Sequence, residues 1–183
     1  MNKDFMYGIG AVKYKGKPVG YVEKNSFDLG GGKPEVAKVE AEQVPGAPVL
    51  VIPQSNGKIA PNFNMIQLKF ESLEQLLGGA LHTKGDATIG WTAPSSAMIM
   101  EGAWEIALVS GQSILIPNAT LLSDLGGKLT LTETAKIEVT LEVSMPTVKD
   151  VPPYGIFASD SLPEEWSEES GWLLPKESTK SGA

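Results

Sequence analysis

The sequence predicts a mainly β protein: a β-barrel or sandwich with one short α-helix packed on it and a C-terminal extension. The recurring pattern is an alternation of apolar and polar residues between turn residues, and only one segment of the body has clear helical periodicity. Glycine and proline are frequent, at 20 and 13 of 183 residues. A hydrophobic content of 42% is enough for one domain with its own core.

Two hairpins and one long strand carry most of the alternation. Residues 9–14 and 19–23 flank a glycine-containing turn and predict the first hairpin, and residues 104–109 and 113–116 predict the second. The clearest strand is residues 136–144, in which four aliphatic residues alternate with polar ones. One face of that strand therefore belongs to the core, and the other face is polar and acidic.

Between the hairpins the pattern is less regular. The apolar run at residues 49–52 predicts a short buried strand that ends at Pro53, because proline cannot donate to a sheet. In residues 59–70 the side chains of Phe63 and Met65 point to the same face of a mixed apolar and polar segment. The face that would point inward is therefore mixed and not cleanly apolar.

One short helix is predicted in the body. Ser72 and Gln75 have the spacing of a capping box, three leucines fall on one face, and Gly78 and Gly79 end the helix. A helix of about six residues is marginal alone, so we expect its leucine face to dock on a sheet. Residues 161–169 have the same capping spacing and predict a second short helix near the C-terminus.

The net charge of −7 is unevenly distributed along the chain. Residues 158–183 carry six acidic residues and two lysines, and two prolines at 152 and 153 mark the start of this segment. We therefore expect a β domain over residues 1–157, with a long loop at residues 25–46. An acidic extension follows over residues 158–183.

Composition argues against several classes of protein. All 15 basic residues are lysines and 22 residues are acidic, whereas nucleic-acid-binding proteins use clustered cations to hold phosphates. The absence of cysteine excludes disulfides, cysteine zinc sites and thiol nucleophiles. No apolar run is long enough for a membrane span, and the first seven residues do not resemble a signal peptide. We expect a protein that has no membrane partner and is not exported by the general route.

We predict no enzyme, no cofactor, and no catalytic or metal-binding residues. His82 is the only histidine and lies in a predicted loop. The sequence has no Gly-x-Ser-x-Gly nucleophile elbow whose serine this histidine could activate. Residues 8–10 and 30–32 lack the further residues of dinucleotide and phosphate loops. Glu138 and Glu142 would lie about 13 Å apart along one strand, too far for the usual glycosidase pair.

Two segments carry apolar residues that a small domain has little means of burying. Residues 25–43 alternate charged and small apolar residues, which is typical of an arm ordered by a partner and equally of a solvated hairpin. The C-terminal segment adds tryptophans and leucines of the kind that interfaces use. The candidate interface residues of the two segments are Phe27, Leu29, Gly30, Gly31, Gly32, Val36, Val39, Trp166, Trp172, Leu173 and Leu174.

Three motifs occur in an order that is typical of one family. They are the opening hairpin, GIGAVKYKGKPVGYV at residues 8–22 followed by NSFD at 25–28; the helix region KFESLEQLLGG at residues 69–79; and KLTLTE at residues 128–133, which leads into KIEV at 136–139. Over residues 7–145 these motifs resemble, in order and spacing, the tail tube proteins (major tail proteins) of tailed bacteriophages. The C-terminal extension departs from that pattern.

The resemblance implies a β-barrel or sandwich subunit that forms homo-hexameric rings, which stack into a hollow tube. DNA passes through the lumen of such a tube during ejection without specific binding. The implied partners are further copies of the chain and the tape-measure, terminator and baseplate proteins of a virion tail, made in the host cytoplasm. By position, residues 27–44 correspond to a ring-stacking loop.

The acidic face of residues 136–144 fits that expectation. Each basic contact on the wall of a conduit would hold phosphates by releasing counterions, whereas an acidic wall repels DNA. We therefore expect Glu138, Thr140, Glu142 and Ser144 to line the lumen.

Two alternative functions remain open at the level of sequence. One is another tail component of related fold, such as a terminator or baseplate ring protein. The other is a small β-sandwich module that binds a carbohydrate or protein ligand. Such a module requires a compact aromatic platform, but the tryptophans at 91, 104, 166 and 172 are scattered along the chain.

Overall fold

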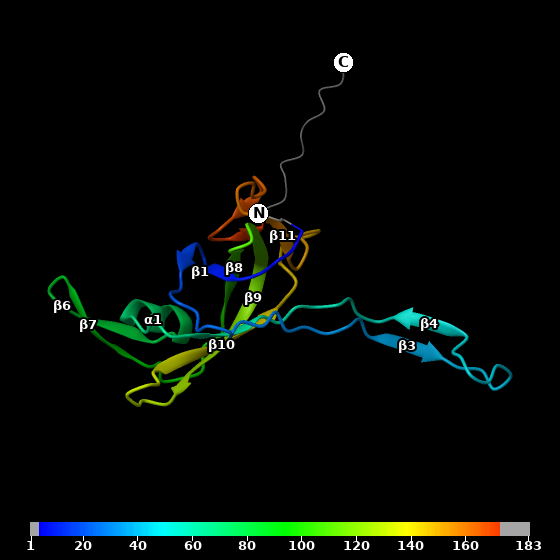
Figure 1. Cartoon of the computed structure of the whole chain (residues 1–183), viewed down its shortest axis with the longest axis horizontal. Helices are drawn as coiled ribbons and strands as arrows, with labels where there is room; N and C mark the ends of the chain where they lie inside the picture. The colour runs from blue at the N-terminus through cyan, green and yellow to red at the C-terminus, as the bar shows by residue number, and fades with distance from the viewer. Residues whose placement is uncertain (1–3, 173–183) are drawn as a thin grey trace, which may run out of the picture.

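The computed structural model describes residues 4–172 (Figure 1). Over that range the chain forms thirteen strands and one helix, α1 (Phe70–Leu77), which lies between β5 and β6. The strands are, in chain order, β1 (Ile9–Tyr14), β2 (Lys17–Pro18), β3 (Val36–Val39), β4 (Leu50–Pro53), β5 (Asn62–Met65), β6 (Ala80–Lys84), β7 (Ala87–Thr92), β8 (Met100–Leu108), β9 (Gln112–Gly127), β10 (Ala135–Val143), β11 (Gly155–Ala158), β12 (Trp166–Ser167) and β13 (Gly171–Trp172).

The main sheet is antiparallel and has seven strands. Its path is β2-β1-β8-β9-β10-β5, and β11 pairs with the first residues of β9. Strand β9 is the longest: residues 113–121 pair with β8, and residues 119–127 pair with β10. The predicted mainly β class is confirmed. The sheet is not closed into a barrel, however, because its outer strands β2 and β5 do not pair with each other.

One face of this sheet, the inner face, holds the core. Directly opposite residues of antiparallel strands share a face, so Ile137 and Met65 point inward together. The ring of Trp104 stacks on that of Tyr14 with 4.5 Å between centroids. The buried side chains of the core are Val12, Tyr14, Val19, Phe63, Met65, Leu73, Leu76, Trp104, Ile106, Ile114, Ile116, Ala119, Leu121, Ile137, Val139 and Leu141.

Both predicted turns form hairpins, but the strand predicted at residues 19–23 is wrong, because β1 pairs instead with Lys17–Pro18. Lys15 and Gly16 have φ angles of 48° and 76°, as in a two-residue type I′ turn, and connect β1 to β2. Strand β2 contains only two residues, and the chain then leaves β1 to follow β5, where Val22 forms a bridge with Met65. The second predicted hairpin is present as β8 and β9. Residues 128–133, which were compared with late strands, lie in the turn from β9 to β10.

Helix α1 docks its leucine face on the inner face of the sheet, as predicted, and two of its leucines are buried. Its predicted capping box is wrong. The N-cap is Lys69, which makes no side-chain cap hydrogen bond, and Ser72 is buried within the helix. The helix ends as predicted at Gly78, whose φ of 72° favours glycine and whose N–H donates to the carbonyl of Glu74.

The described part of the C-terminal segment, residues 159–172, folds back on the main sheet, and residues 161–169 do not form the predicted helix. That segment consists of turns and β12, which pairs with β13. The reason is the aromatic hairpin itself: pairing places Trp166 opposite Trp172, and Gly171, with a φ of 84°, packs against the chain at Pro117. The domain border expected after residue 157 falls inside β11.

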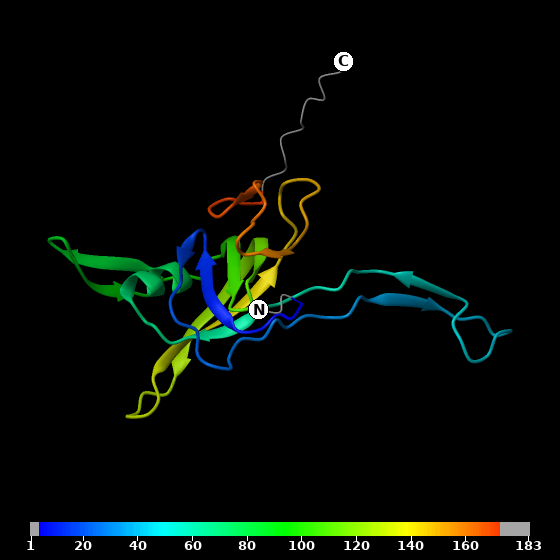
Figure 2. The same ribbon diagram turned by 45° about the horizontal axis from the view of Figure 1, so that its top comes forward.

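Two hairpins project from the domain in opposite directions (Figures 1 and 2). Strands β3 and β4 form the longer one, and β6 and β7 form the other. His82, expected in a loop, lies in β6, and its Nε2 is 3.1 Å from the hydroxyl of Thr92 in β7. Neither hairpin is part of the main sheet.

Candidate functional site: the arm and the acidic sheet face

Residues 28–62, which include β3 and β4, form an arm with a tightly packed root. At the root, Gly32 and Lys58 exchange backbone hydrogen bonds of 3.0 and 3.2 Å. Gly30 and Gly31 have φ angles of 55° and 113°, and a Cβ on either would lie 2.3 Å from a carbonyl oxygen of the opposite segment. Only glycine permits so close an approach. The glycine run therefore positions the arm.

Beyond the root, the two faces of the arm differ in chemistry. Ala37 lies opposite Ile52 and Val39 lies opposite Leu50, so these four apolar residues share one side, the apolar arm face. The other side carries Val36, Lys38, Val51 and Pro53. The side chains of Val39, Leu50 and Ile52 are 45%, 52% and 45% exposed. A two-stranded ribbon that exposes aliphatic residues to this extent is marginal without a partner.

The predicted stacking-loop residues divide between the arm and the domain. Val36 and Val39 are exposed on the arm, and Leu29 is 36% exposed at the root. Phe27 lies in the domain instead, where its ring stacks on that of Phe63 with 5.7 Å between centroids.

The expectation that residues 49–52 form a buried strand is wrong. These residues run into β4, and each is 45% to 52% exposed. A short run of aliphatic residues looks the same in a buried strand and in an exposed arm, so no local signal separates the two. What decides burial is whether another element packs on the run.

The outer face of β10 presents the predicted acidic residues. Its burial pattern alternates as expected, with Glu138 and Glu142 exposed and the intervening aliphatic residues in the core. Thr140 is half-buried on the same face. Ser144 follows the strand, and its hydroxyl accepts a hydrogen bond of 3.0 Å from the side-chain amide of Asn118.

Neighbouring strands extend this surface into an acidic face. Glu138 lies directly opposite Asp124 in β9, and Thr120 lies between Glu142 of β10 and Glu101 of β8. Like charges placed directly opposite each other destabilise a sheet, so this arrangement is not explained by stability. The acidic face, defined as Glu101, Asp124, Glu138 and Glu142, is partly balanced by Lys136, 4.0 Å from Glu138.

The other half of the outer face is covered by the C-terminal segment. Leu115 of β9 and its opposite neighbour Glu105 of β8 are buried beneath it. The ring of Trp172 lies 5.1 Å from that of Phe157 and 6.4 Å from that of Trp166, centroid to centroid. Within the single chain, the two tryptophans predicted to lie at an interface therefore pack on each other, which covers part of their surface. Leu173 and Leu174 lie outside the described residues.

Lys13 connects the C-terminal segment to the sheet. Its Nζ lies 3.0 Å from a carboxylate oxygen of Glu105 and 3.0 Å from one of Glu168. The hydroxyl of Ser113 also donates to Glu105, at 3.4 Å. Partial burial lowers the pKa of Lys13, but the hydrogen bonds and charges of the two carboxylates outweigh it, and the pKa lies above the usual 10.5.

We expect Lys13→Met to lower the free energy of unfolding by about 1–2 kcal/mol at neutral pH, because the buried carboxylate of Glu105 loses its cation. The exposed partner Glu168 adds little, since water screens that pair. A raised pKa in the folded state means that the stabilisation by Lys13 is complete below pH 10.5 and is lost as the pH rises further.

Urea denaturation of the wild type and Lys13→Met at about pH 7 and about pH 11.5 measures both effects. The difference in stability should shrink at the higher pH. Lys15→Met is the matched control, since Lys15 is exposed and lies over the ring of Tyr14. An equal difference at both pH values would contradict the assignment.

Among residues 4–172, no group of three or more histidine, aspartate or glutamate side chains is placed to hold a metal ion. No helix within this range is long and apolar enough to cross a membrane. No protein-family model matches the sequence, and no curated protein matches it either.

Proposed function

We propose that this chain is a tail tube subunit of a bacteriophage virion, whose copies form rings that stack into a hollow tube. The observation that carries the proposal is the arm: an extended hairpin whose valines, leucine and isoleucine are about half exposed. Burying aliphatic surface of this kind is the main favourable term in protein association. Other copies of the chain provide that burial in the proposed assembly.

The number and arrangement of subunits follow from the family resemblance of residues 7–145. It supplies the hexameric ring, the stacking of rings by the arm, and the tape-measure, terminator and baseplate proteins as partners. The projecting arm supports this part of the proposal because it reaches well beyond its own domain (Figure 2). An element of that shape is suited to contact a neighbour in a ring above or below.

The acidic face supplies the wall of the lumen in this proposal. It lies on the part of the outer sheet surface that the C-terminal segment leaves uncovered. Its four carboxylates all point to that side of the sheet. Negative charge keeps phosphates away from the wall, so DNA passes without specific binding. No cofactor takes part.

Negative-stain electron microscopy of the purified chain over a concentration series tests the proposal. We expect rings or hollow tubes to appear as the concentration rises, because association follows mass action. Single rings that never stack would favour the terminator or baseplate alternative. A uniform monomer at every concentration would exclude the tube function and favour the ligand-binding module.

A further inference from the structure

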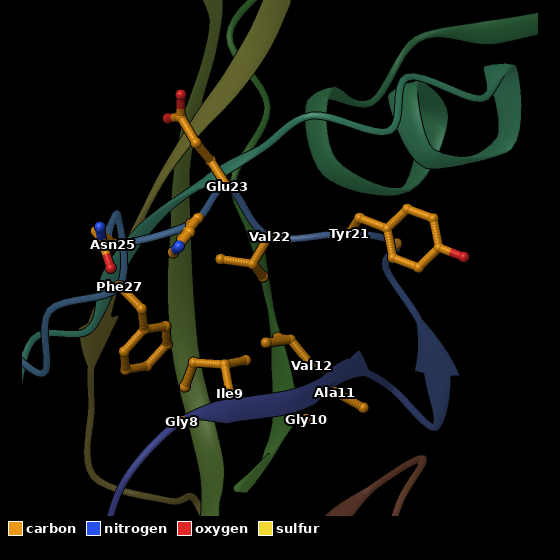
Figure 3. A pocket seen from close by; sticks show the side chains of 12 residues that line it. Gly8, Ile9, Gly10, Ala11, Val12, Tyr21, Val22, Glu23, Asn25 and Phe27 are labelled. Atoms are coloured by element: carbon orange, nitrogen blue, oxygen red, sulfur yellow. The ribbon is translucent and has the colours of Figure 1, made fainter. Parts of the chain in front are cut away.

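A groove of about 440 Å³ lies between β1 and the segment that follows β2 (Figure 3). Residues 8–12 form one wall and residues 20–27 form the other. The side chains of Ile9, Val22 and Phe27 point into the space between the walls and pack against the core. The groove therefore has an apolar floor that is continuous with the interior of the domain.

The β1 wall is an uncovered strand edge. One edge of β1 pairs with β8, whereas β2 covers the other edge only at the last two residues of β1. The carbonyl of Val12 accepts a hydrogen bond of 3.1 Å from Val19, at the narrow end of the groove. Among the described residues, no backbone hydrogen bond joins residues 8–11 to residues 21–27. Such an edge presents N–H and C=O groups that are in place to pair with another strand.

The opposite wall is anchored to the far side of the sheet. Val22 forms a bridge with Met65 of β5. The carboxylate of Glu23 accepts a hydrogen bond of 2.6 Å from the side-chain amide of Asn64 and lies 3.4 Å from the ammonium of Lys136. These contacts hold residues 21–23 on β5, and the groove marks the gap that leaves the main sheet open.

The arm has the features that this groove requires of an occupant. Its apolar face carries four aliphatic side chains, and β3 and β4 each have one edge that pairs with no other strand of the described chain. The arm begins directly after Phe27 and projects away from the domain that contains the groove (Figure 2). The backbone bonds between Gly32 and Lys58 join its two segments directly beyond the root. An arm that fills the groove therefore comes from a second copy.

Charge also matches between the two surfaces. The arm from residue 35 to residue 42 carries three glutamates against one lysine, and Glu40 and Glu42 lie toward its tip. Lys24 lies on the groove wall beside Glu23, whose carboxylate is paired with Lys136, and the neighbouring β1–β2 turn adds Lys15 and Lys17. Complementary charges of this kind favour one orientation and speed association at low salt.

From these observations we infer that the arm of a second copy enters the groove and pairs with the free edge of β1, with its apolar face on Ile9, Val22 and Phe27. One added strand extends the main sheet toward residues 21–27 and covers the apolar floor. This mode of recognition is β-strand addition, in which backbone hydrogen bonds provide affinity and side chains provide specificity. The inference rests on the proposed self-association, but it does not depend on a role in a virion.

The arm and the groove are different surfaces of the same chain, so the contact is heterologous. A heterologous contact leaves a free arm on one copy and a free groove on the other. Where each arm enters the groove of the next copy, repetition produces closed rings or open-ended stacks, whereas reciprocal exchange of arms between two copies would close a dimer. The inference thus names the contact that makes the proposed assembly extendable.

Cross-linking of full-length single-cysteine variants tests the inference without background, because the chain contains no cysteine. Ile52→Cys places a thiol on the apolar arm face, and Val22→Cys places one in the groove, where the side chain of Val22 points into the space between the walls. The two variants are mixed, treated with a short bis-maleimide and analysed by peptide mass spectrometry. Two control mixtures replace Ile52→Cys by Val51→Cys on the other arm face, or Val22→Cys by Leu131→Cys on the fully exposed β9–β10 turn.

We expect the Ile52→Cys and Val22→Cys mixture to give at least about tenfold more cross-linked heterodimer than either control. We also expect the yield to fall as salt rises. Equal yields in all three mixtures would overturn the inference, and so would the absence of any arm–groove cross-link. Tubes without this cross-link would leave the proposed function standing and refute the docking mode. The cross-link without rings or tubes would support the docking mode and refute the proposed tube function.

Discussion

The double variant Leu50→Asp with Ile52→Asp should abolish assembly while leaving the subunit folded. Both side chains lie on the apolar arm face and are about half exposed in the single chain, so the domain core does not depend on them. In an assembly they would be buried. Two lost aliphatic contacts and two carboxylates without partners cost about 4 kcal/mol or more, which raises the concentration needed for assembly about a thousandfold.

The matched control for this variant is Val36→Asp with Val51→Asp, which adds the same charge to the other face of the arm. We expect it to weaken assembly much less. Sedimentation velocity over a concentration series measures assembly, and thermal unfolding measures the fold. Unchanged assembly of Leu50→Asp with Ile52→Asp would show that the arm is not an interface, and a lower melting temperature would show that the arm stabilises its own domain.

Reversal of charge on the acidic face should turn a non-binding wall into one that retains DNA. The change is Glu138→Lys with Glu142→Lys, two exposed positions on the outer face of β10. Six subunits in each proposed ring would then carry twelve added cations, each of which releases counterions on contact with phosphate. We expect assembly to persist, and we expect duplex DNA to remain in the lumen at low salt and to be released as salt rises.

Tubes assembled with short duplex DNA and then sedimented provide the measurement. Wild-type tubes should leave the DNA in the supernatant, whereas the variant should pellet it in a form protected from nuclease. The control Glu164→Lys with Glu169→Lys adds the same charge at exposed positions of the C-terminal segment. DNA held by that control should be digested. Nuclease-sensitive DNA on the Glu138 and Glu142 variant would place the acidic face outside the lumen, and failure to assemble would place it in a packed interface.

Most of the sheet was predictable because its signals are local. The alternation in residues 136–144 assigned Ile137 to the core and Glu138 to the surface, and both assignments are confirmed. The turn at Lys15 and Gly16 and the helix end at Gly78 were also predictable, because positive φ angles favour glycine at such positions.

The errors occur where contacts distant in sequence decide the structure. Residues 161–169 have a helix-start pattern, yet the pairing of Trp166 with Trp172 and their packing on the sheet keep the segment extended. The helix start at Lys69 lacks any side-chain cap, because docking of the leucine face stabilises α1 instead. Tertiary packing outweighs weak local preferences in both cases.

By itself the sequence determined that the protein is mainly β, which strands alternate, and that one strand carries an acidic face. Only the tertiary structure decided which apolar residues are exposed to solvent and which are packed against another element. Residues 49–52 lie on a projecting arm, whereas Trp166 and Trp172 fold onto the sheet. It also decided that β1 keeps an open edge beside the groove. The physical reason is that periodicity reports which way a side chain points, while burial depends on what distant parts of the chain place against it.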